Sequence, residues 1–486
     1  MPRIWCLIAL LTCATSLTAA DTTEAAKVAP WVKTLPPVDA SASFFGVLGG
    51  ISTNHLAPMP MAKVRASGPA ALYADSEQLA QAVSGMTARG ANYAAPLVAG
   101  GIRWFRDVQN MPWGFIEVQS GTYRFEVLDA IVTAVQAAGG TYVGTVMPYA
   151  GWDFIAGGVP PATDPMCVRL LDEDFFYLTF DRRMDRYRDE NAFLRFLTAV
   201  VERYDGDGLE DMPGLTTPVL HWQIHNEPEG ERCGLFRNDV AAFERLMFLA
   251  SHAIRTNCPD CLVLNGGAAA QLYRENENPA PQGVHFWRDY ASLGGASSID
   301  IIAVHYNEGK SDSYGNLDDF EYLIHRAREL LGTGKPVWVT EFGVVIGDHG
   351  NFKGLTETEA AAWYIRMDTA GLAAGAVKFF PDASGFMEMN GTTYLTFYVQ
   401  KLIQAKLGGF TSATKLADGQ YRFTVNGRDI YVLWNGVPST LSGNVRVTDY
   451  YGNITVQSVS SLTPSEAKPV FVENAESAGR RRAARH

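Results

Sequence analysis

The sequence predicts a (β/α)8 barrel followed by a small antiparallel β-sandwich. From about residue 44 to 405, short apolar runs alternate with longer helical segments, and eight such repeats imply parallel strands closed into a barrel. After about residue 408 the pattern changes to short strand-like runs between turns. With 486 residues, of which 47% are hydrophobic, the chain can bury the cores of both parts.

A doubly wound open sheet is the alternative fold for repeated strand–helix units. Such sheets bind phosphate groups on a glycine-rich turn after an early strand, and no turn of that kind follows the first strands here. The barrel is therefore the favoured fold.

The barrel strands are predicted from short runs of apolar and β-branched residues. They cover residues 44–48, 102–106, 141–147, 219–225, 262–265, 300–304, 336–340 and 376–380. The clearest helices between them are predicted at 125–138, 190–204, 239–256, 318–331 and 356–370. Within 318–331, the apolar residues Ile324, Ala327, Leu330 and Leu331 recur at helical spacing.

The predicted sandwich spans residues 406–474. A domain of this size buries too little surface to be stable by itself, so we expect it to pack against the barrel. Its strands are expected at 421–425, 430–434, 445–449 and 469–472, with turns at 426–427 and 451–453. The predicted barrel spans residues 44–405. Residues 21–43 form a lead-in, in which 28–38 is a candidate additional strand of the sandwich.

The first 20 residues have the pattern of a secretory signal. Arg3 provides the positive start, residues 4–11 the apolar centre and residues 18–20 the small-residue exit, so cleavage is expected after Ala20. No later apolar run reaches transmembrane length. The sequence therefore predicts a secreted or periplasmic protein without a membrane span.

The net charge of −12 restricts the partners. Four positive charges lie in residues 475–486, predicted to be a disordered basic tail, so the folded body is more acidic still. An acidic body argues against nucleic acid and anionic membranes as main partners.

Four cysteines follow the signal, and cysteines in an exported chain favour disulfides. Cys258 and Cys261 span a short helix-to-strand turn and could bond to each other. Cys167 would then pair with Cys233. Free buried thiols are the alternative.

Two glutamates end apolar strands, although a carboxylate is costly to desolvate there. Glu227 follows the fourth predicted strand and Glu341 the seventh. Both positions are C-terminal strand ends, where the chemistry of such barrels gathers. Paired carboxylates in this place favour glycoside hydrolysis, in which one acid is protonated and the other ionised. A structural ion-pair role for each glutamate is the alternative.

The segments around these glutamates resemble the two catalytic motifs of the clan A glycoside hydrolases. They read His225-Asn226-Glu227-Pro228 and Thr340-Glu341-Phe342-Gly343. The stretch from Gly101 to Asp129 is similar to the second strand and helix of that clan, so the resemblance covers the whole barrel. With its trailing sandwich, the chain looks closest to family 39 relatives, especially bacterial enzymes that act on exopolysaccharides.

The resemblance implies a role for each matching position. Glu227 would be the general acid/base and Glu341 the nucleophile. Asn226 would bind the sugar 2-hydroxyl and Arg106 would keep the nucleophile ionised. Tyr306 would donate a hydrogen bond to Glu341, and its neighbour His305 is a second candidate for supporting the site.

Aromatic residues near the strand ends could form platforms for sugar rings. Trp113 and Trp152 are the candidates, whereas Trp222 and Trp338 lie inside strands and are expected in the core. The acidic loop 205–211 has the oxygen-rich spacing of a calcium site but lacks a complete EF-hand, so a capped, solvated turn is the alternative. No metal and no organic cofactor are expected in the reaction.

Together these observations predict a retaining glycoside hydrolase that cleaves β-linked poly- or oligosaccharide outside the cytoplasm by double displacement. A transglycosylase would use the same residues. A non-catalytic carbohydrate-binding barrel in an export or biofilm assembly is the alternative from another class. Sugar identity, linkage, endo or exo action and oligomeric state are not determined by the sequence.

Overall fold

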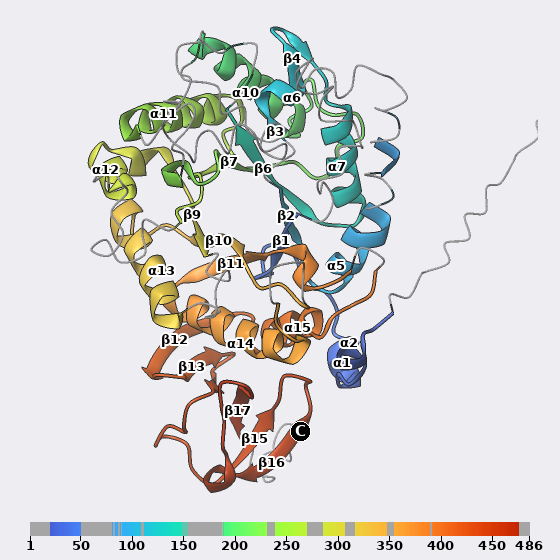
Figure 1. Cartoon of the computed structure of the whole chain (residues 1–486), viewed down its shortest axis with the longest axis vertical. Helices are drawn as coiled ribbons and strands as arrows, with labels where there is room; N and C mark the ends of the chain where they lie inside the picture. The colour runs from blue at the N-terminus through green and yellow to red at the C-terminus, as the bar shows by residue number, and fades with distance from the viewer. Residues whose placement is uncertain are drawn as a thin grey trace, which may run out of the picture.

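The computed structural model of the chain forms a barrel with an antiparallel sheet at its C-terminus (Figure 1). It describes residues 20–49, 90–107, 111–148, 189–230, 239–269, 285–306, 316–347, 354–388 and 391–475, with a few single positions between them. The expected signal (1–20, except Ala20) and the basic tail after 475 lie outside the described residues.

Eight parallel strands form the barrel within the described part of the chain. They are β1 (Gly46–Leu48), β2 (Trp104–Arg106), β6 (Thr141–Met147), β7 (His221–Ile224), β8 (Leu262–Leu264), β9 (Ile302–Tyr306), β10 (Val337–Phe342) and β11 (Ala376–Pro381). Hydrogen bonds connect them in the orders β1-β2-β6-β7-β8 and β11-β10-β9. Parallel bridges Phe45–Phe379 and Leu264–Ile301 join the two sheets, which closes the ring. The predicted barrel is confirmed.

Helices surround these strands. The larger ones are α7 (Glu126–Ala137), α10 (Glu190–Tyr204), α11 (Val240–Asn257), α12 (Phe286–Ser292), α13 (Leu317–Leu331), α14 (Glu357–Ala374) and α15 (Leu395–Leu407). Helix α14 begins at a capping box, in which Thr356 and Glu359 satisfy each other's backbone N–H groups. It ends at Gly375, whose φ of 105° suits a residue without a Cβ.

Shorter elements complete the first half of the barrel. They are the π-helix η2 (Gly90–Ala94), α5 (Ala95–Ala99), β3 (Met111–Pro112), α6 (Trp113–Ile116), and the hairpin of β4 (Glu117–Gln119) and β5 (Thr122–Tyr123). Strand β3 adds to the edge of β6. The described residues of the barrel also form the 3-10 turns η3 (Pro228–Gly230), η5 (Gly295–Ser298) and η6 (Ala383–Gly385).

The strands separate two hydrophobic layers. Side chains inside the barrel form one cluster, with Trp104, Leu264, Ala303, Trp338 and Phe380 among its members. Their strand neighbours face the helices and join the large outer core. Because successive side chains of a strand point to opposite faces, this division shows which positions of each strand point into the barrel.

The C-terminal part is antiparallel, as the sequence predicts. Its strands are β12 (Phe410–Ala417), β13 (Gln420–Val425), β14 (Arg428–Leu433), β15 (Asn444–Thr448), β16 (Ile454–Ser458) and β17 (Val470–Asn474), with the 3-10 turn η7 (Val459–Ser461) after β16. Hydrogen bonds join all six in one sheet in the order β12-β13-β14-β17-β15-β16.

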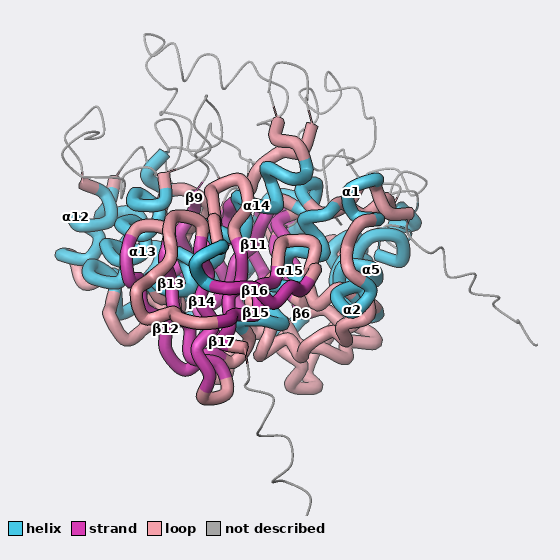
Figure 2. The backbone as a smooth tube through the Cα atoms, turned by 90° about the horizontal axis from the view of Figure 1, so that it is seen from below, coloured by secondary structure: helices cyan, strands magenta, loops and turns pink. Residues whose placement is uncertain are grey.

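This sheet lies against the barrel next to α14 and α15 (Figures 1 and 2). Tyr421 donates a 2.7 Å hydrogen bond to Glu321 of α13, and Lys406 of α15 pairs with Glu473 at 2.6 Å. The expected packing of the small domain on the barrel is therefore present.

The lead-in differs from expectation. The segment 28–38, a candidate strand of the sandwich, instead contains the short helix α2 (Pro30–Lys33), and another short helix, α1 (Thr23–Ala26), precedes it. Thr22 caps α1, and Pro30 stands at the first position of α2, where its missing N–H and fixed φ favour a helix. The lead-in still contacts the C-terminal sheet, since Trp31 Nε1 donates to the Gly452 carbonyl at 2.8 Å.

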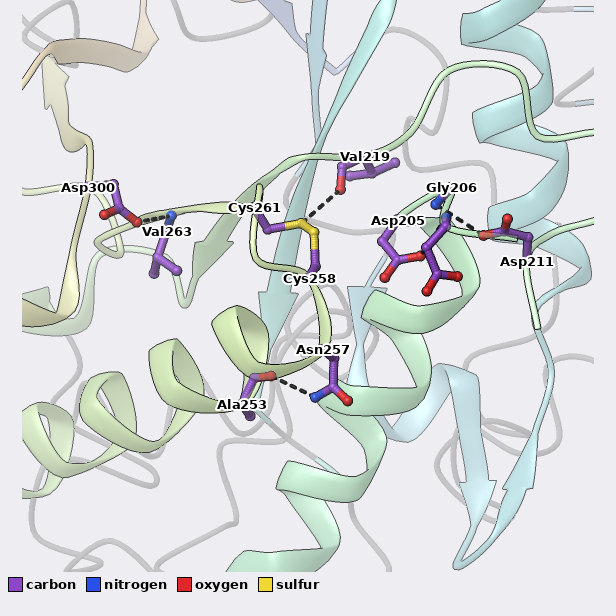
Figure 3. Close-up of a disulfide and its surroundings, with 11 residues drawn as sticks. Asp205, Gly206, Asp211, Val219, Ala253, Asn257, Cys258, Cys261, Val263 and Asp300 are labelled. Atoms are coloured by element: carbon purple, nitrogen blue, oxygen red, sulfur yellow. Dashed lines mark hydrogen bonds between the residues drawn. A yellow bond between two sulfur atoms is a disulfide. The ribbon is translucent and has the colours of Figure 1, made fainter. Parts of the chain in front are cut away.

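A disulfide joins Cys258 and Cys261 in the turn between α11 and β8, with their Cα atoms 5.3 Å apart (Figure 3). The other expected partners, Cys167 and Cys233, lie outside the described residues. Among the helices that the structure describes, none has the length and apolarity needed to cross a bilayer.

Candidate active site

Glu227 is held by an irregular turn at the end of β7. His225 and Glu227 have φ values of 72° and 48°, a left-handed conformation that is uncommon for residues other than glycine. Backbone bonds hold the turn on both sides: His225 N–H donates to the Val146 carbonyl at 2.8 Å, and Glu227 N–H donates to the Gly266 carbonyl at 2.6 Å. Such strain is typical of functional sites, where the surrounding structure enforces it.

Glu341 reaches the barrel interior through a register shift in β10. Val339 pairs with Val304 of β9, but Glu341 pairs with His305, so Thr340 is the extra residue of a bulge. Trp338 points into the barrel, and simple alternation would turn Glu341 outward. The bulge reverses the alternation and places Glu341 beside the inward-facing His305.

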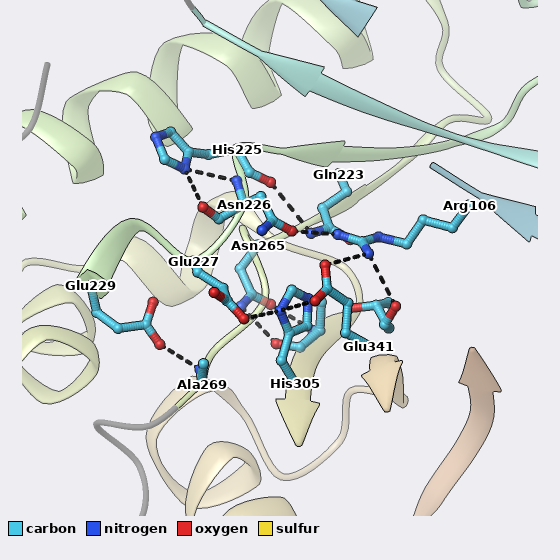
Figure 4. A network of polar contacts seen from close by, with 12 residues as sticks. Arg106, Gln223, His225, Asn226, Glu227, Glu229, Asn265, Ala269, His305 and Glu341 are labelled. Carbon is cyan, nitrogen blue, oxygen red and sulfur yellow. Dashed lines mark hydrogen bonds and ion pairs between the residues drawn. The ribbon is translucent and has the colours of Figure 1, made fainter. Parts of the chain in front are cut away.

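Arg106 at the end of β2 connects the two motifs (Figure 4). Its side chain is fully buried, and Nη1 lies 3.0 Å from Glu341 Oε1. Nη2 donates to Asn226 Oδ1 at 2.7 Å, and Nε donates to Gln223 Oε1 at 2.9 Å. A buried guanidinium next to Glu341 favours the ionised form of that carboxylate. Arg106 thus contacts Glu341 directly, and its role in keeping Glu341 ionised stays a prediction.

His305 lies between the two glutamates. Its Nδ1 is 2.9 Å from Glu227 Oε1 and 3.7 Å from Glu341 Oε2, and its ring is fully buried. Gly267 makes room for this ring, because a Cβ there would lie 2.1 Å from His305 Nε2. The φ of 77° at Gly267 also favours glycine.

One donor oxygen of Glu227, one of Glu341 and one ring nitrogen of His305 lie within 4.8 Å of one another. The side chain of Glu227 is 36% exposed and that of Glu341 only 13%. The two acids therefore converge from opposite sides of the barrel, in different surroundings: one next to a buried cation, the other more open. The same three donors are close enough to share a cation, although the guanidinium of Arg106 already supplies positive charge at Glu341.

Glu229 is a buried acid two residues after Glu227. Its Oε1 accepts a hydrogen bond from the Ala269 N–H, which ties η3 to the segment after β8. Burial raises the pKa of Glu229 to about 7, although the nearby Trp287 indole and the Ala269 N–H act in the opposite direction. The negative charge of Glu227 adds to the increase.

Two of the expected supporting residues lie elsewhere. The hydroxyl of Tyr306 does not serve Glu341 as expected; it donates to the Asn316 carbonyl and accepts from the Asn316 N–H, both at 2.8 Å. Tyr306 is next to His305 in β9, so it points to the opposite face and packs on Phe320 of α13.

Trp113 is a core residue and not a sugar platform. It is 0% exposed, packs among Phe193, Phe196 and Tyr187, and donates from Nε1 to Glu117 Oε2 at 2.5 Å. The platform prediction failed because the segment that follows β2 packs against α10, which buries the Trp113 ring. The other candidate platform, Trp152, lies outside the described residues.

Two residues of the network were not singled out from the sequence. Gln223 lies on β7 with its side chain on the inner face, opposite to Trp222, and binds Arg106 Nε. Asn265, directly after β8, exchanges two hydrogen bonds with the backbone of Ala303, at 2.6 and 2.9 Å. A polar residue in an otherwise apolar strand was the available signal for both.

Comparison with known family models gives a match to part of the chain. Residues 263–366 match a family model described as a glycosyl hydrolase catalytic core. This segment runs from β8 into α14 and includes His305 and Glu341. No curated protein matches the chain in sequence.

Solved structures show a similar fold. A family 39 β-xylosidase from Caulobacter crescentus has a TM-score of 0.52 and 13% identity, covering 90% of this chain and 97% of that one. A monomeric β-xylosidase from the same organism has a TM-score of 0.51 and 12% identity, with the same coverage of both chains. A family 30 endoxylanase from Clostridium papyrosolvens has a TM-score of 0.49 and 12% identity, covering 79% of this chain and 92% of that one.

A segment similar to a glycosyl hydrolase catalytic core thus forms part of a barrel in which Glu227 and Glu341 lie close together. The fold is similar to that of the two β-xylosidases, and the two glutamates follow the fourth and seventh barrel strands.

Proposed function

We propose that the protein is a retaining glycoside hydrolase that cleaves β-glycosidic bonds of an extracellular poly- or oligosaccharide by double displacement. The observation that carries this proposal is the approach of Glu227 and Glu341, whose donor oxygens lie within 4.8 Å of each other. Retaining enzymes hold their carboxyl groups about 5–5.5 Å apart, whereas inverting enzymes leave room for a water at roughly 6.5–9.5 Å.

The surroundings of the acids support a division of roles. Glu341 is paired with the buried Arg106, which favours the bare carboxylate that a nucleophile requires. Glu227 is the more exposed acid and has the ring of His305 as its hydrogen-bond partner. We therefore assign the proton to Glu227.

In the first step, Glu227 gives its proton to the glycosidic oxygen while Glu341 attacks the anomeric carbon. The glycosidic bond breaks, the alcohol leaves and a glycosyl ester forms on Glu341. In the second step, Glu227 takes a proton from water, whose oxygen attacks the same carbon and releases Glu341. Two inversions restore the original anomeric configuration.

Asn226 supports the transition state in this proposal. Its Oδ1 accepts from Arg106, so its amide nitrogen is oriented to donate to the 2-hydroxyl of the sugar. This bond strengthens as positive charge develops on the ring. Arg106 thereby sets the position of both Asn226 and Glu341 with one side chain.

A β-linked substrate is proposed because the acids have the strand positions of clan A and the similar solved structures include β-xylosidases. A polymeric substrate is proposed because long segments, 51–100 and 151–189, follow the first and third predicted strands, where they would wall an extended groove; most of them lie outside the described residues. Screening the mature protein against plant, microbial and host glycans and aryl β-glycosides would identify the sugar.

The test of the roles uses two variants and two kinds of substrate. Glu341→Gln should lose turnover of every substrate, because no nucleophile remains. Glu227→Gln should lose turnover of substrates with poor leaving groups while keeping much of the first step with aryl groups that leave without protonation. Proton NMR of the first product should show retained configuration; inversion, or equal losses with both leaving groups in Glu227→Gln, would contradict the assignment.

Export of the chain is also a proposal, supported by the signal-like first 20 residues. Expression in the native host, followed by fractionation and N-terminal sequencing, should recover a mature protein that begins at Asp21 outside the cytoplasm. Recovery of the full-length chain in the cytoplasm would contradict it.

A further inference from the structure

The loop 205–211 brings together acidic side chains at the end of the barrel opposite to the active site. It follows the C-terminus of α10 and precedes β7, whereas Glu227 comes after β7. Figure 3 shows it beside the Cys258–Cys261 disulfide, which lies in the corresponding turn before β8.

Three carboxylates of this loop converge. Asp205, Asp207 and Asp211 each present an oxygen, and these oxygens lie within 4.8 Å of one another. Asp207 is exposed and Asp211 half-buried, but Asp205 is only 8% exposed. The three residues thus form a cluster that extends from the surface into the protein.

The buried member of the cluster has an unsatisfied oxygen. Oδ1 of Asp205 accepts from the Asp207 N–H at 3.3 Å, but the buried Oδ2 has no hydrogen-bond partner among the described residues. A buried carboxylate oxygen without a donor or a cation is costly, and native proteins nearly always supply one. Oδ2 is therefore the atom at which a donor or a cation is expected to bind.

The surroundings offer no positive side chain for this role. Burial raises the pKa of Glu202, and the charges of Asp207, Glu210 and Asp211 add to the increase, so a fourth and a fifth carboxyl lie within electrostatic range. In the described part of the chain, no lysine, arginine or histidine forms an ion pair with any of the five. Arg203, the nearest arginine in sequence, pairs with Asp129 instead.

Backbone N–H groups hold two of the carboxylates in place. Asp211 accepts from Gly206 and Gly208 at 3.0 and 2.9 Å, and Asp207 accepts from Leu209 at 2.7 Å. Each carboxylate oxygen has two lone pairs, so an oxygen that accepts one N–H can still bind a cation.

We propose that the loop 205–211 binds one Ca²⁺ ion through the carboxylates of Asp205, Asp207 and Asp211. Calcium is favoured because every donor is an oxygen and because Ca²⁺ accepts irregular geometry in flexible loops. Water and loop carbonyls would complete its six to eight ligands. The ion neutralises the carboxylates and ties α10 to the entry of β7.

Calcium binding to the full-length, metal-stripped protein tests this proposal. Isothermal titration with CaCl₂ should show one site, and the Tm should rise with Ca²⁺ concentration relative to EDTA, because the ion binds the folded state. Asp207→Asn should weaken binding by at least about tenfold. Asp260→Asn, the same change in an exposed aspartate of the neighbouring turn, is the matched control and should bind as wild type does.

Asp205→Asn distinguishes a metal site from a simple turn. In EDTA this variant should have a higher Tm than wild type, since an amide removes the buried repulsion, whereas in millimolar Ca²⁺ the order should reverse. Turnover by folded protein should not depend on Ca²⁺, because Glu227 and Glu341 lie at the other end of the barrel. A wild-type Tm that is equal in Ca²⁺ and EDTA, binding that survives in Asp207→Asn, or a preference for Mg²⁺ would overturn the proposal.

Discussion

Arg106 Nη1 lies 3.0 Å from Glu341 Oε1, and the same guanidinium binds Asn226 Oδ1 through Nη2. One buried cation thus connects the nucleophile proposed on β10 with the substrate-binding amide proposed after β7. Its other acceptors in the described structure are Gln223 and the Thr340 carbonyl. The four acceptors use the fork geometry of arginine and could not all be reached by a lysine.

Arg106→Lys tests this connection, because it keeps the charge and loses the fork. We expect kcat/KM to fall by about 100-fold or more, the size of effect seen when one aligned donor is removed from a transition state. Steady-state kinetics on an aryl β-glycoside would measure it, with circular dichroism to verify folding. Arg103→Lys is the control: Arg103 binds the backbone carbonyls of Val38 and Gly139, so kcat/KM should stay within about twofold of wild type. Equal losses in both variants would argue against the proposed role of Arg106.

Gly267→Ala should displace His305. The new Cβ would lie 2.1 Å from His305 Nε2, and the ring could not keep its position between the glutamates. We expect a large loss of kcat. The free energy of unfolding should also fall by roughly 1–2 kcal/mol, because alanine is strained in the left-handed conformation. Gly294 has a similar φ, 93°, but a Cβ there would meet no atom within 4 Å. Gly294→Ala should therefore lose a similar amount of stability and keep its turnover. Denaturation curves and kinetics of the two variants separate strain from displacement; unchanged turnover in Gly267→Ala would contradict the role of His305.

Glu229 should make stability depend on pH. Its folded pKa of about 7 lies above the ordinary value of 4.5, so the protonated form is favoured by folding. This contribution is present below about pH 4.5 and is lost as the pH rises through 7, a change of about 3 kcal/mol in the free energy of unfolding. Urea denaturation at pH 5 and pH 8 would measure it.

Glu229→Gln removes the titration but keeps an acceptor for the Ala269 N–H. The decrease in stability between the two pH values should be smaller in this variant by about the same 3 kcal/mol. Glu126→Gln, at an exposed position in the first turn of α7, should leave the decrease unchanged. An identical pH dependence in wild type and Glu229→Gln would sink this interpretation.

Trp113→Phe distinguishes a core residue from a sugar platform. The ring is fully buried among aromatic residues and its Nε1 binds Glu117, so the variant should lose about 1–3 kcal/mol of stability. Since no part of Trp113 is exposed to substrate, KM should stay close to that of wild type. A raised KM with unchanged stability would restore the platform hypothesis.

Periodicity in the sequence predicted the main elements closely. The strand predicted at 141–147 and the helix predicted at 190–204 have the observed bounds, and the other predicted strands differ by no more than two residues at either end. Apolar runs and helical spacing determine such elements because they reflect which side chains must be buried. The two glutamates were found because a charge at the end of an apolar strand is unusual.

The orientation of side chains at the site was harder to predict. Tyr306 and His305 are neighbours in one strand, and a shift of one residue exchanges which of them points inward. The bulge at Thr340 that turns Glu341 towards His305 leaves no mark in the composition of β10. Trp113 looked like a loop residue because its burial comes from α10, more than seventy positions later in the chain.

The sequence by itself determined the barrel, the antiparallel C-terminal part and the two acidic strand ends, because local patterns of polarity encode them. Tertiary structure alone decided that His305 stands between Glu227 and Glu341, that Gln223 orients Arg106 and that Asp205 is buried beside two other carboxylates. Those relationships depend on strand register and on contacts between distant segments, which follow from how the closed barrel packs as a whole.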